Sequence, residues 1–110
     1  MKDDVVYLRH ILEAIEKIES YVKGAAYESF SRNDMMIDAV VRELEIIGEA
    51  SSNLSEEFRT EHGDVPWRDA IDMRNFLIHE YFGVRTKVVW DTCREDLPLM
   101  KRLLSKFLSS

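Results

Sequence analysis

The sequence predicts an all-α protein, an up-and-down bundle of four long helices with room for one short helix. Apolar residues recur at spacings of three, four and seven along most of the 110 residues, as on one face of a helix. Only 4 Gly and 2 Pro are present, too few for a β fold rich in tight turns. No linker is long enough to divide the chain, so we expect one helical domain over residues 1–110.

The first two helices are expected over residues 3–23 and 33–54. Gly24 is a natural stop for the first, and Ser31 followed by Asp34 resembles a capping box for the second. Gly48 lies inside the second helix at a cost of about 1 kcal/mol relative to Ala, and close approach of another helix would explain it. The expected apolar faces are Val5, Leu8, Leu12, Ile15 and Val22, flanked by Ile11 and Ile18, and then Met36, Val40, Leu44, Ile47 and Leu54.

The other two long helices are expected over residues 66–82 and 86–108. Residues 55–63 are polar and predict one short helical turn at most. Pro66 suits the first turn of the third helix, which Gly83 should end. Pro98 should kink the fourth helix, because it lacks an N–H and clashes with the carbonyl of Arg94. The apolar face of this helix is Trp90, Cys93, Leu97, Met100, Leu104 and Phe107.

Composition excludes several classes of protein. The formal charge of −6 disfavours indiscriminate binding to nucleic acid, although it leaves room for a local basic cleft. One cysteine cannot form an internal disulfide, and no apolar run is long enough for a membrane span or signal peptide, so we expect a cytoplasmic protein. The histidines show no metal-ligand spacing and no Gly-rich phosphate loop is present, so we expect neither a metal site nor a cofactor.

Arg74 interrupts the apolar face of the third long helix. At 100° per residue, the apolar side chains within about 60° of it are Trp67, Ala70, Ile71, Leu77, Ile78 and Tyr81. A guanidinium there is costly unless it is paired or faces a polar cleft. Two interpretations remain open, a structural ion pair with Glu43 or Glu49 and a functional role.

A second line of polar residues runs beside that face. Asn75 and His79 are four residues apart, so their side chains can touch. His79 lies about 140° around the axis from Arg74, so either the arginine bends toward it or the site combines two protomers. Met73 and Phe76 fall outside the main apolar face, which predicts a second buried surface and a homodimer.

These residues resemble the HEPN superfamily, in its HepT-like branch. The branch signature is Arg, four residues, His, one residue and Tyr, and Arg74, His79 and Tyr81 match it. Similar segments are Val-Pro-Trp-Arg-Asp at 65–69, Ile-Ile-Gly-Glu-Ala at 46–50 and Asp-Leu-Pro at 96–98, so the resemblance covers nearly the whole chain. One departure is Arg85, which stands where an acidic helix cap is expected.

The resemblance implies a metal-independent RNA endonuclease, with tRNA among its candidate targets. It also implies the toxin of a type VII-like toxin–antitoxin system, a homodimer whose Arg and His residues meet in the interface cleft. The implied partner is a minimal nucleotidyltransferase that transfers AMP to Tyr81. Arg74, His79 and Asn75 would be catalytic. RNA contacts are assigned to Arg68, Arg85 and Lys87 on other grounds, because basic residues gather around the third expected helix and the start of the fourth. The alternative is a non-catalytic helical interaction module, or a substrate-presenting subunit of a nucleotidyltransferase complex.

Overall fold

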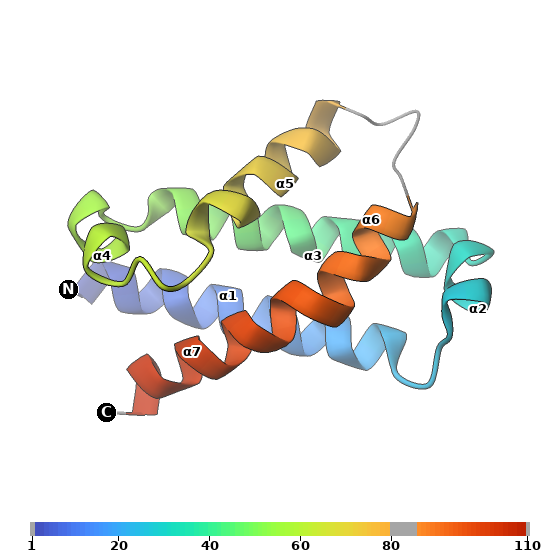
Figure 1. The fold of residues 1–110 in the computed structure, drawn as a ribbon, viewed down its shortest axis with the longest axis horizontal. Coiled ribbons are helices and arrows are strands. Elements are labelled where there is room, and N and C mark those ends of the chain that lie inside the picture. The colour runs from blue at the N-terminus through green and yellow to red at the C-terminus, as the bar shows by residue number, and fades with distance from the viewer. Residues whose placement is uncertain (1, 80–85, 110) are drawn as a thin grey trace.

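A computed structural model describes residues 2–79 and 86–109, and every regular element in these two stretches is a helix. Consecutive long helices run in alternating directions, as Figure 1 shows. The prediction of an all-α bundle is therefore confirmed. The elements are α1 (Lys2–Val22), α2 (Tyr27–Ser31), α3 (Asp34–Asn53), α4 (Glu56–Glu61), α5 (Trp67–His79), α6 (Thr86–Asp91), the π-helical turn η1 (Thr92–Asp96) and α7 (Leu97–Ser109).

The buried side of α1 is rotated from the predicted one. Its fully buried apolar side chains are Leu8, Ile11, Ala14, Ile15 and Ile18, whereas Val5 is 39% exposed. The residues expected to flank the apolar face therefore lie at its centre. Asp4 also belongs to this side, because its carboxylate accepts hydrogen bonds from the backbone N–H and the hydroxyl of Ser55, both at 2.8 Å. This contact joins the start of α1 to the start of α4.

Short helices account for two differences from the predicted elements. α2 was not predicted, because five residues are too few to show a helical period. Its Phe30 is fully buried against Trp90, with ring centroids 5.0 Å apart. The predicted capping box at Ser31 is wrong, since Ser31 closes α2 and Asn33 caps α3 by accepting from the Met36 N–H at 3.0 Å.

Pro98 is accommodated by a change of helix type. The chain forms one helical run from α6 through η1 to α7, and the π-helical turn ends at Asp96, two residues before the proline. The Leu97 N–H donates to the Thr92 carbonyl, five residues back. A wider turn of this kind is a known adjustment where the regular hydrogen-bond ladder is interrupted. The predicted helical run is confirmed, and a π-helical turn that was not predicted precedes the proline, whereas the kink stays a prediction.

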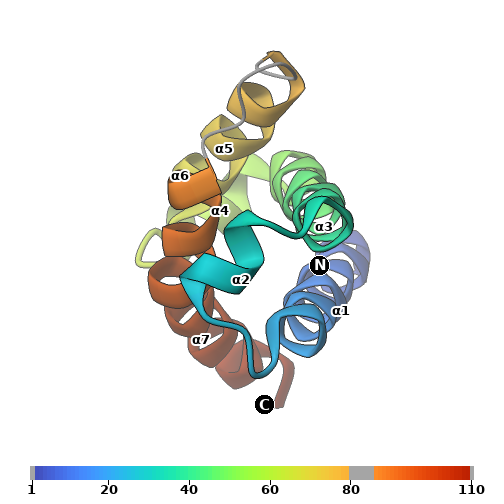
Figure 2. The same cartoon turned by 90° about the vertical axis from the view of Figure 1, so that its right-hand side faces the viewer.

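Gly48 lies where α5 crosses α3. A Cβ at position 48 would overlap the Cβ of Arg74 and would lie 2.7 Å from the carbonyl oxygen of Ala70. The predicted close approach of another helix is confirmed. The far end of α5, beyond this crossing, projects from the rest of the bundle (Figures 1 and 2). α5 begins at Trp67, one residue after Pro66, and the predicted end at residues 80–82 lies outside the described residues.

Candidate active site

Arg74 lies on α5, and its side chain forms an ion pair with a residue of α3. Its Nη2 lies 2.7 Å from Oε2 of Glu49, and its Nη1 donates a hydrogen bond to Oδ1 of Asn75 at 3.3 Å. Of the two carboxylates considered from the sequence, Glu49 is therefore the partner. Glu43 is only 7% exposed and is not paired with Arg74.

The ion pair between Arg74 and Glu49 is accessible to solvent, and it is therefore weak enough for another anion to replace the carboxylate. The Arg74 and Glu49 side chains are 32% and 54% exposed. Exposed pairs of this kind contribute about 0–1 kcal/mol to stability, so another anion can displace the carboxylate at little cost. A guanidinium carries five N–H donors in a planar fork, which matches two oxygens of one phosphate. Arg74 is thus both paired and free to exchange its partner.

The pair lies in a surface groove of about 400 Å³ between α1, α3 and α5. We call this the Arg74 groove. α1 contributes Tyr7 and His10, and α5 contributes Arg74 and Ile78. The side chains from α3 are Arg42, Glu45, Ile46, Glu49, Ala50 and Asn53. Sequence reasoning found Arg74 and Glu49 but missed the contributions of α1, because helical periodicity does not reveal which helices face each other.

The other catalytic residues predicted on α5 are only partly described. Asn75 is exposed and adjoins Arg74. His79 is the last residue of α5, and its side chain lies outside the described part of the structure. α5 is a regular helix between Arg74 and His79, so the two positions are separated by about 140° around its axis. Tyr81 and Arg85 lie outside the described residues.

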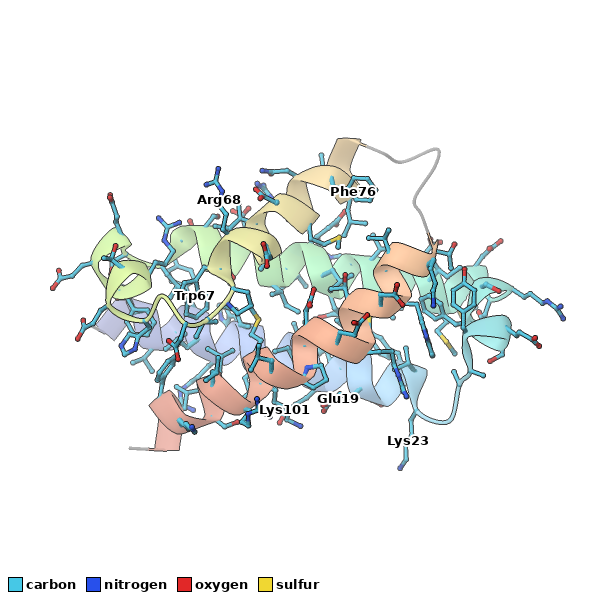
Figure 3. The ribbon with its side chains drawn as sticks, viewed as in Figure 1. Glu19, Lys23, Trp67, Arg68, Phe76 and Lys101 are labelled. Atoms are coloured by element: carbon cyan, nitrogen blue, oxygen red, sulfur yellow. The ribbon has the colours of Figure 1, made fainter. Side chains whose placement is uncertain are left out.

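The described residues assigned to RNA contact lie away from the Arg74 groove. Arg68 is 83% exposed, is 3.5 Å from Asp72, and points away from the bundle in Figure 3. Lys87 on α6 is 3.1 Å from Asp91 and 4.9 Å from the ring centroid of Tyr27. Neither residue lines the groove. Their contact with RNA remains a prediction.

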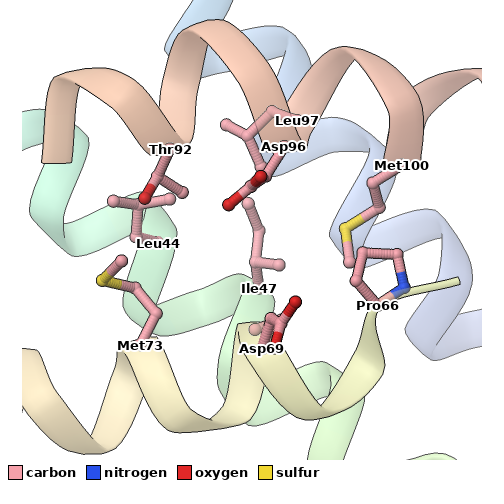
Figure 4. A pocket seen from close by; sticks show the side chains of 10 residues that line it. Leu44, Ile47, Pro66, Asp69, Met73, Thr92, Asp96, Leu97 and Met100 are labelled. Carbon is pink, nitrogen blue, oxygen red and sulfur yellow. The ribbon is translucent and has the colours of Figure 1, made fainter. Parts of the chain in front are cut away.

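The two residues assigned to a dimer surface are partly covered by their own chain, and the homodimer itself stays a prediction. Met73 and Phe76 are partly buried and pack against the core of their own chain. They were assigned to a second surface because they lie off the main apolar face of α5. On the Met73 side, the η1–α7 run lies across a small cavity (Figure 4) that Met73 lines together with Thr92, Leu97 and Met100. Ile78, at 45% exposure, is the apolar residue of α5 that remains open.

Three other kinds of function, a reactive cysteine, a membrane span and a metal site, find no support in the described residues. Cys93 is buried, as predicted, and desolvation raises the pKa of its thiol to about 12. The thiol is therefore protonated at neutral pH and is a poor nucleophile. No described helix is both long and apolar enough to cross a lipid bilayer. Among the described residues, no three His, Cys, Asp or Glu side chains form a group that could hold a metal ion.

A second, smaller cavity separates α5 from the η1–α7 run. It has a volume of about 30 Å³, room for about one water molecule, and its walls are mostly apolar. Figure 4 shows the carboxylates of Asp69 and Asp96 extending into the space between these helices. Burial, then the charges of Asp69 and Glu95, raise the pKa of Asp96. The cavity is a packing gap with an unfavourable charge pair at its rim.

Replacing Asp96 with asparagine should therefore stabilise the fold at neutral pH. The folded state binds the Asp96 proton more tightly than the unfolded state does, so stability is lost as pH rises through the raised pKa. Asparagine removes that loss, and we expect a gain of at most about 1 kcal/mol because solvent screens the repulsion. Urea unfolding at pH 7 measures the gain, which should disappear below pH ~4. Glu13→Gln, at an exposed carboxylate of α1, is the control; an equal gain there would contradict the account.

The described geometry defines an α-helical protein with an arginine in a surface groove, and another anion can replace the carboxylate that pairs with this arginine. A family model described as "Ribonuclease HepT-like" matches residues 11–107. The chain belongs to this family, which confirms the resemblance to the HEPN superfamily. Among solved structures, none matches the chain significantly.

Relatives support the same assignment. A "Putative RNase" of Caldanaerobacter subterraneus subsp. tengcongensis is 43% identical over 108 residues, which cover 98% of this chain and 96% of that protein. A "Probable ribonuclease HepT" of Thermococcus cleftensis is 45% identical over 100 residues, 91% of each chain. A "Gamma-glutamylcyclotransferase and putative RNase" of Methanocaldococcus jannaschii is 42% identical over 107 residues, 97% of this chain and 48% of that protein. Each of the three names describes its protein as a ribonuclease, two of them as "putative" and one as "probable".

Proposed function

We propose that this protein is the toxin of a toxin–antitoxin pair and that it cleaves RNA, such as tRNA, in the cytoplasm without a metal ion. The observation that carries the proposal is the Arg74 guanidinium, which sits in an open groove with an exchangeable carboxylate partner. It precedes His79 by five residues on the same helix, in a chain of the ribonuclease HepT-like family.

The chemistry follows from what RNA cleavage needs when no metal takes part. The ribose 2′-oxygen attacks the adjacent phosphorus while the bond from phosphorus to the 5′-oxygen breaks. One group accepts the proton of the 2′-hydroxyl, and another donates a proton to the departing 5′-oxygen. An imidazole such as that of His79 can fill either role near neutral pH. Arg74 would bind the phosphate and stabilise the added charge of the transition state, and Asn75 would orient its neighbours.

A homodimer would supply the second imidazole. Within one protomer, Arg74 and His79 lie on different sides of α5, so one helix does not bring them together. Two-fold pairing would place both residues of each protomer in one cleft and separate the base from the acid. The projecting end of α5 and its exposed Ile78 offer a surface for this pairing.

The proposed regulation acts on Tyr81. A partner nucleotidyltransferase would join the phenolic oxygen to the α-phosphorus of ATP, with pyrophosphate as the leaving group and the phenolic proton passing to a base of the partner. Tyr81 follows His79 by two residues, so the attached AMP would place bulk and negative charge beside the site. Both oppose the entry of an RNA phosphate.

The test is RNA cleavage by the purified wild type in the presence and absence of EDTA. Intact-mass analysis first establishes that the protein carries no AMP. We expect cleavage that persists in EDTA and stops after incubation with the partner nucleotidyltransferase and ATP. Intact RNA under all conditions would favour the alternative, a non-catalytic interaction module or substrate-presenting subunit, which the charge of −6 also favours.

A further inference from the structure

We propose that the α1 side of the Arg74 groove is a nucleotide subsite, in which Tyr7 and His10 bind one base of single-stranded RNA beside the phosphate held by Arg74. The inference rests on the proposed function, because it takes the ligand of Arg74 to be RNA. It adds α1 to a site whose catalytic residues the sequence places on α5.

The two rings form a fixed surface for a base. Tyr7 is half-buried and packs against the hydrophobic core, whereas His10 is exposed. Their ring centroids are 6.2 Å apart and their planes meet at 84°, an edge-to-face contact. Any nucleobase can stack on an aromatic ring, and such stacking strengthens binding by roughly 5- to 150-fold per base. The subsite therefore accepts different bases.

The polar groups of the groove fit the remainder of a nucleotide. Arg42 is 71% exposed and lies 3.9 Å from Glu45, and Arg74 is paired with Glu49, so each guanidinium has a carboxylate that phosphate can replace. The Asn53 amide lines the same groove and can both donate to and accept from a base edge. The volume of about 400 Å³ lies within the range of small-ligand sites.

The carboxylates of Glu45 and Glu49 weaken the binding of RNA to the groove. Glu45 and Glu49 oppose a polyanion unless phosphate takes their arginine partners, so charge alone does not drive binding. Affinity must then come from stacking together with the exchange of ion-pair partners. This account predicts that a short RNA binds through its bases as well as its backbone, even though the chain is acidic overall.

Single-stranded RNA fits the lining better than a second copy of this chain does. The cores of protein–protein interfaces are depleted of glutamate and aspartate, whereas Glu45 and Glu49 both line this groove. The groove is also continuous with the guanidinium that is assigned to phosphate. The dimer surface is assigned to the projecting end of α5, whose Ile78 also lines the groove, so the two sites adjoin each other.

The test uses a short single-stranded RNA in which every 2′-hydroxyl is methylated, so that it binds without being cleaved. Fluorescence anisotropy compares its affinity for the wild type, Tyr7→Leu and Tyr7→Phe. We expect Tyr7→Leu to bind about tenfold more weakly or worse, and Tyr7→Phe to bind like the wild type because it keeps a ring. Tyr21→Leu is the control, since Tyr21 is the other tyrosine of α1, is 37% exposed and lies outside the groove.

His10→Ala keeps the inference testable if Tyr7→Leu does not fold, because His10 is exposed and its loss leaves the core unchanged. We expect several-fold weaker RNA binding from it, with an unchanged sedimentation coefficient. Wild-type affinity in both His10→Ala and a folded Tyr7→Leu would overturn the inference. A loss of dimer with unchanged RNA affinity would also overturn it, because the groove would then be a protein interface.

The inference and the proposed function can fail separately. If the wild type cleaves unmodified RNA but the α1 variants bind normally, only the nucleotide subsite is excluded. If the wild type binds the methylated RNA through Tyr7 but cleaves no RNA, the subsite stands and the ribonuclease proposal falls.

Discussion

Replacing Arg74 with alanine is expected to reduce the rate of RNA cleavage by about 10²–10³-fold, the usual effect of removing one group that stabilises transition-state charge. Arg74 lies in the groove on α5, the helix that also carries His79. A phosphate can replace Glu49 as the partner of its guanidinium. Single-turnover cleavage with excess protein measures the rate without the contribution of product release. Arg74→Lys should recover only part of the rate, because an ammonium cannot form the planar two-point contact with phosphate.

The fold should survive this change. The Arg74–Glu49 pair is solvent-exposed, so its loss should alter the free energy of unfolding by less than about 1 kcal/mol. Circular dichroism and thermal unfolding check this directly. Arg102→Ala removes an exposed arginine of α7 and is the control for net charge. If Arg74→Ala and Arg102→Ala cleave RNA equally well, Arg74 has no part in the chemistry.

Gly48→Val should have the largest effect on stability. The new side chain would overlap Cβ of Arg74 and the backbone of Ala70, and a backbone carbonyl cannot move aside as a flexible side chain can. We expect a loss of about 3 kcal/mol, the upper end of the usual range for overpacked cores. For a domain of this size, that corresponds to a fall of roughly 10–20 °C in the midpoint of thermal unfolding.

The same change should impair the site. α5 can relieve the overlap only by moving away from α3, which separates Arg74 from Glu49 and opens the groove. Gly63→Ala is the control, because a Cβ there would meet its nearest neighbour at 3.6 Å, an ordinary contact. Thermal unfolding of the two variants side by side measures the difference. A Gly48→Val protein as stable as Gly63→Ala would show that α3 and α5 do not approach as closely as described.

The predictable features depend on periodicity and on local chemistry. Gly48 and Arg74 each violated the expected pattern of a helix, and the structure places them against each other at the crossing of α3 and α5. Gly48 on α3 and Arg74 on α5 thus both indicated the contact between these two helices. The adjacent Glu49 could be named as a partner for the arginine from the sequence alone, although it could not be distinguished from Glu43.

The remaining features depend on which helices become neighbours. Tyr7 and His10 gave no signal, because their place in the groove follows from the position of α1 beside α3, which the sequence of α1 does not specify. Phe76, assigned to a second surface, packs partly against the core of its own chain, and the homodimer stays a prediction. A helical wheel shows the side on which a residue lies, but it does not show whether the same chain covers that side.

The most direct test of the account is the cleavage rate of His79→Ala beside that of AMP-free wild type, with EDTA present throughout. His79 is the one residue of the motif able to transfer protons near neutral pH, and general acid–base catalysis contributes about 10²–10⁴-fold to a rate. The account predicts a folded variant that binds methylated RNA normally and cleaves unmodified RNA at least about 100-fold more slowly. Equal cleavage by the two proteins would contradict it, because the reaction would then need no imidazole at the end of α5.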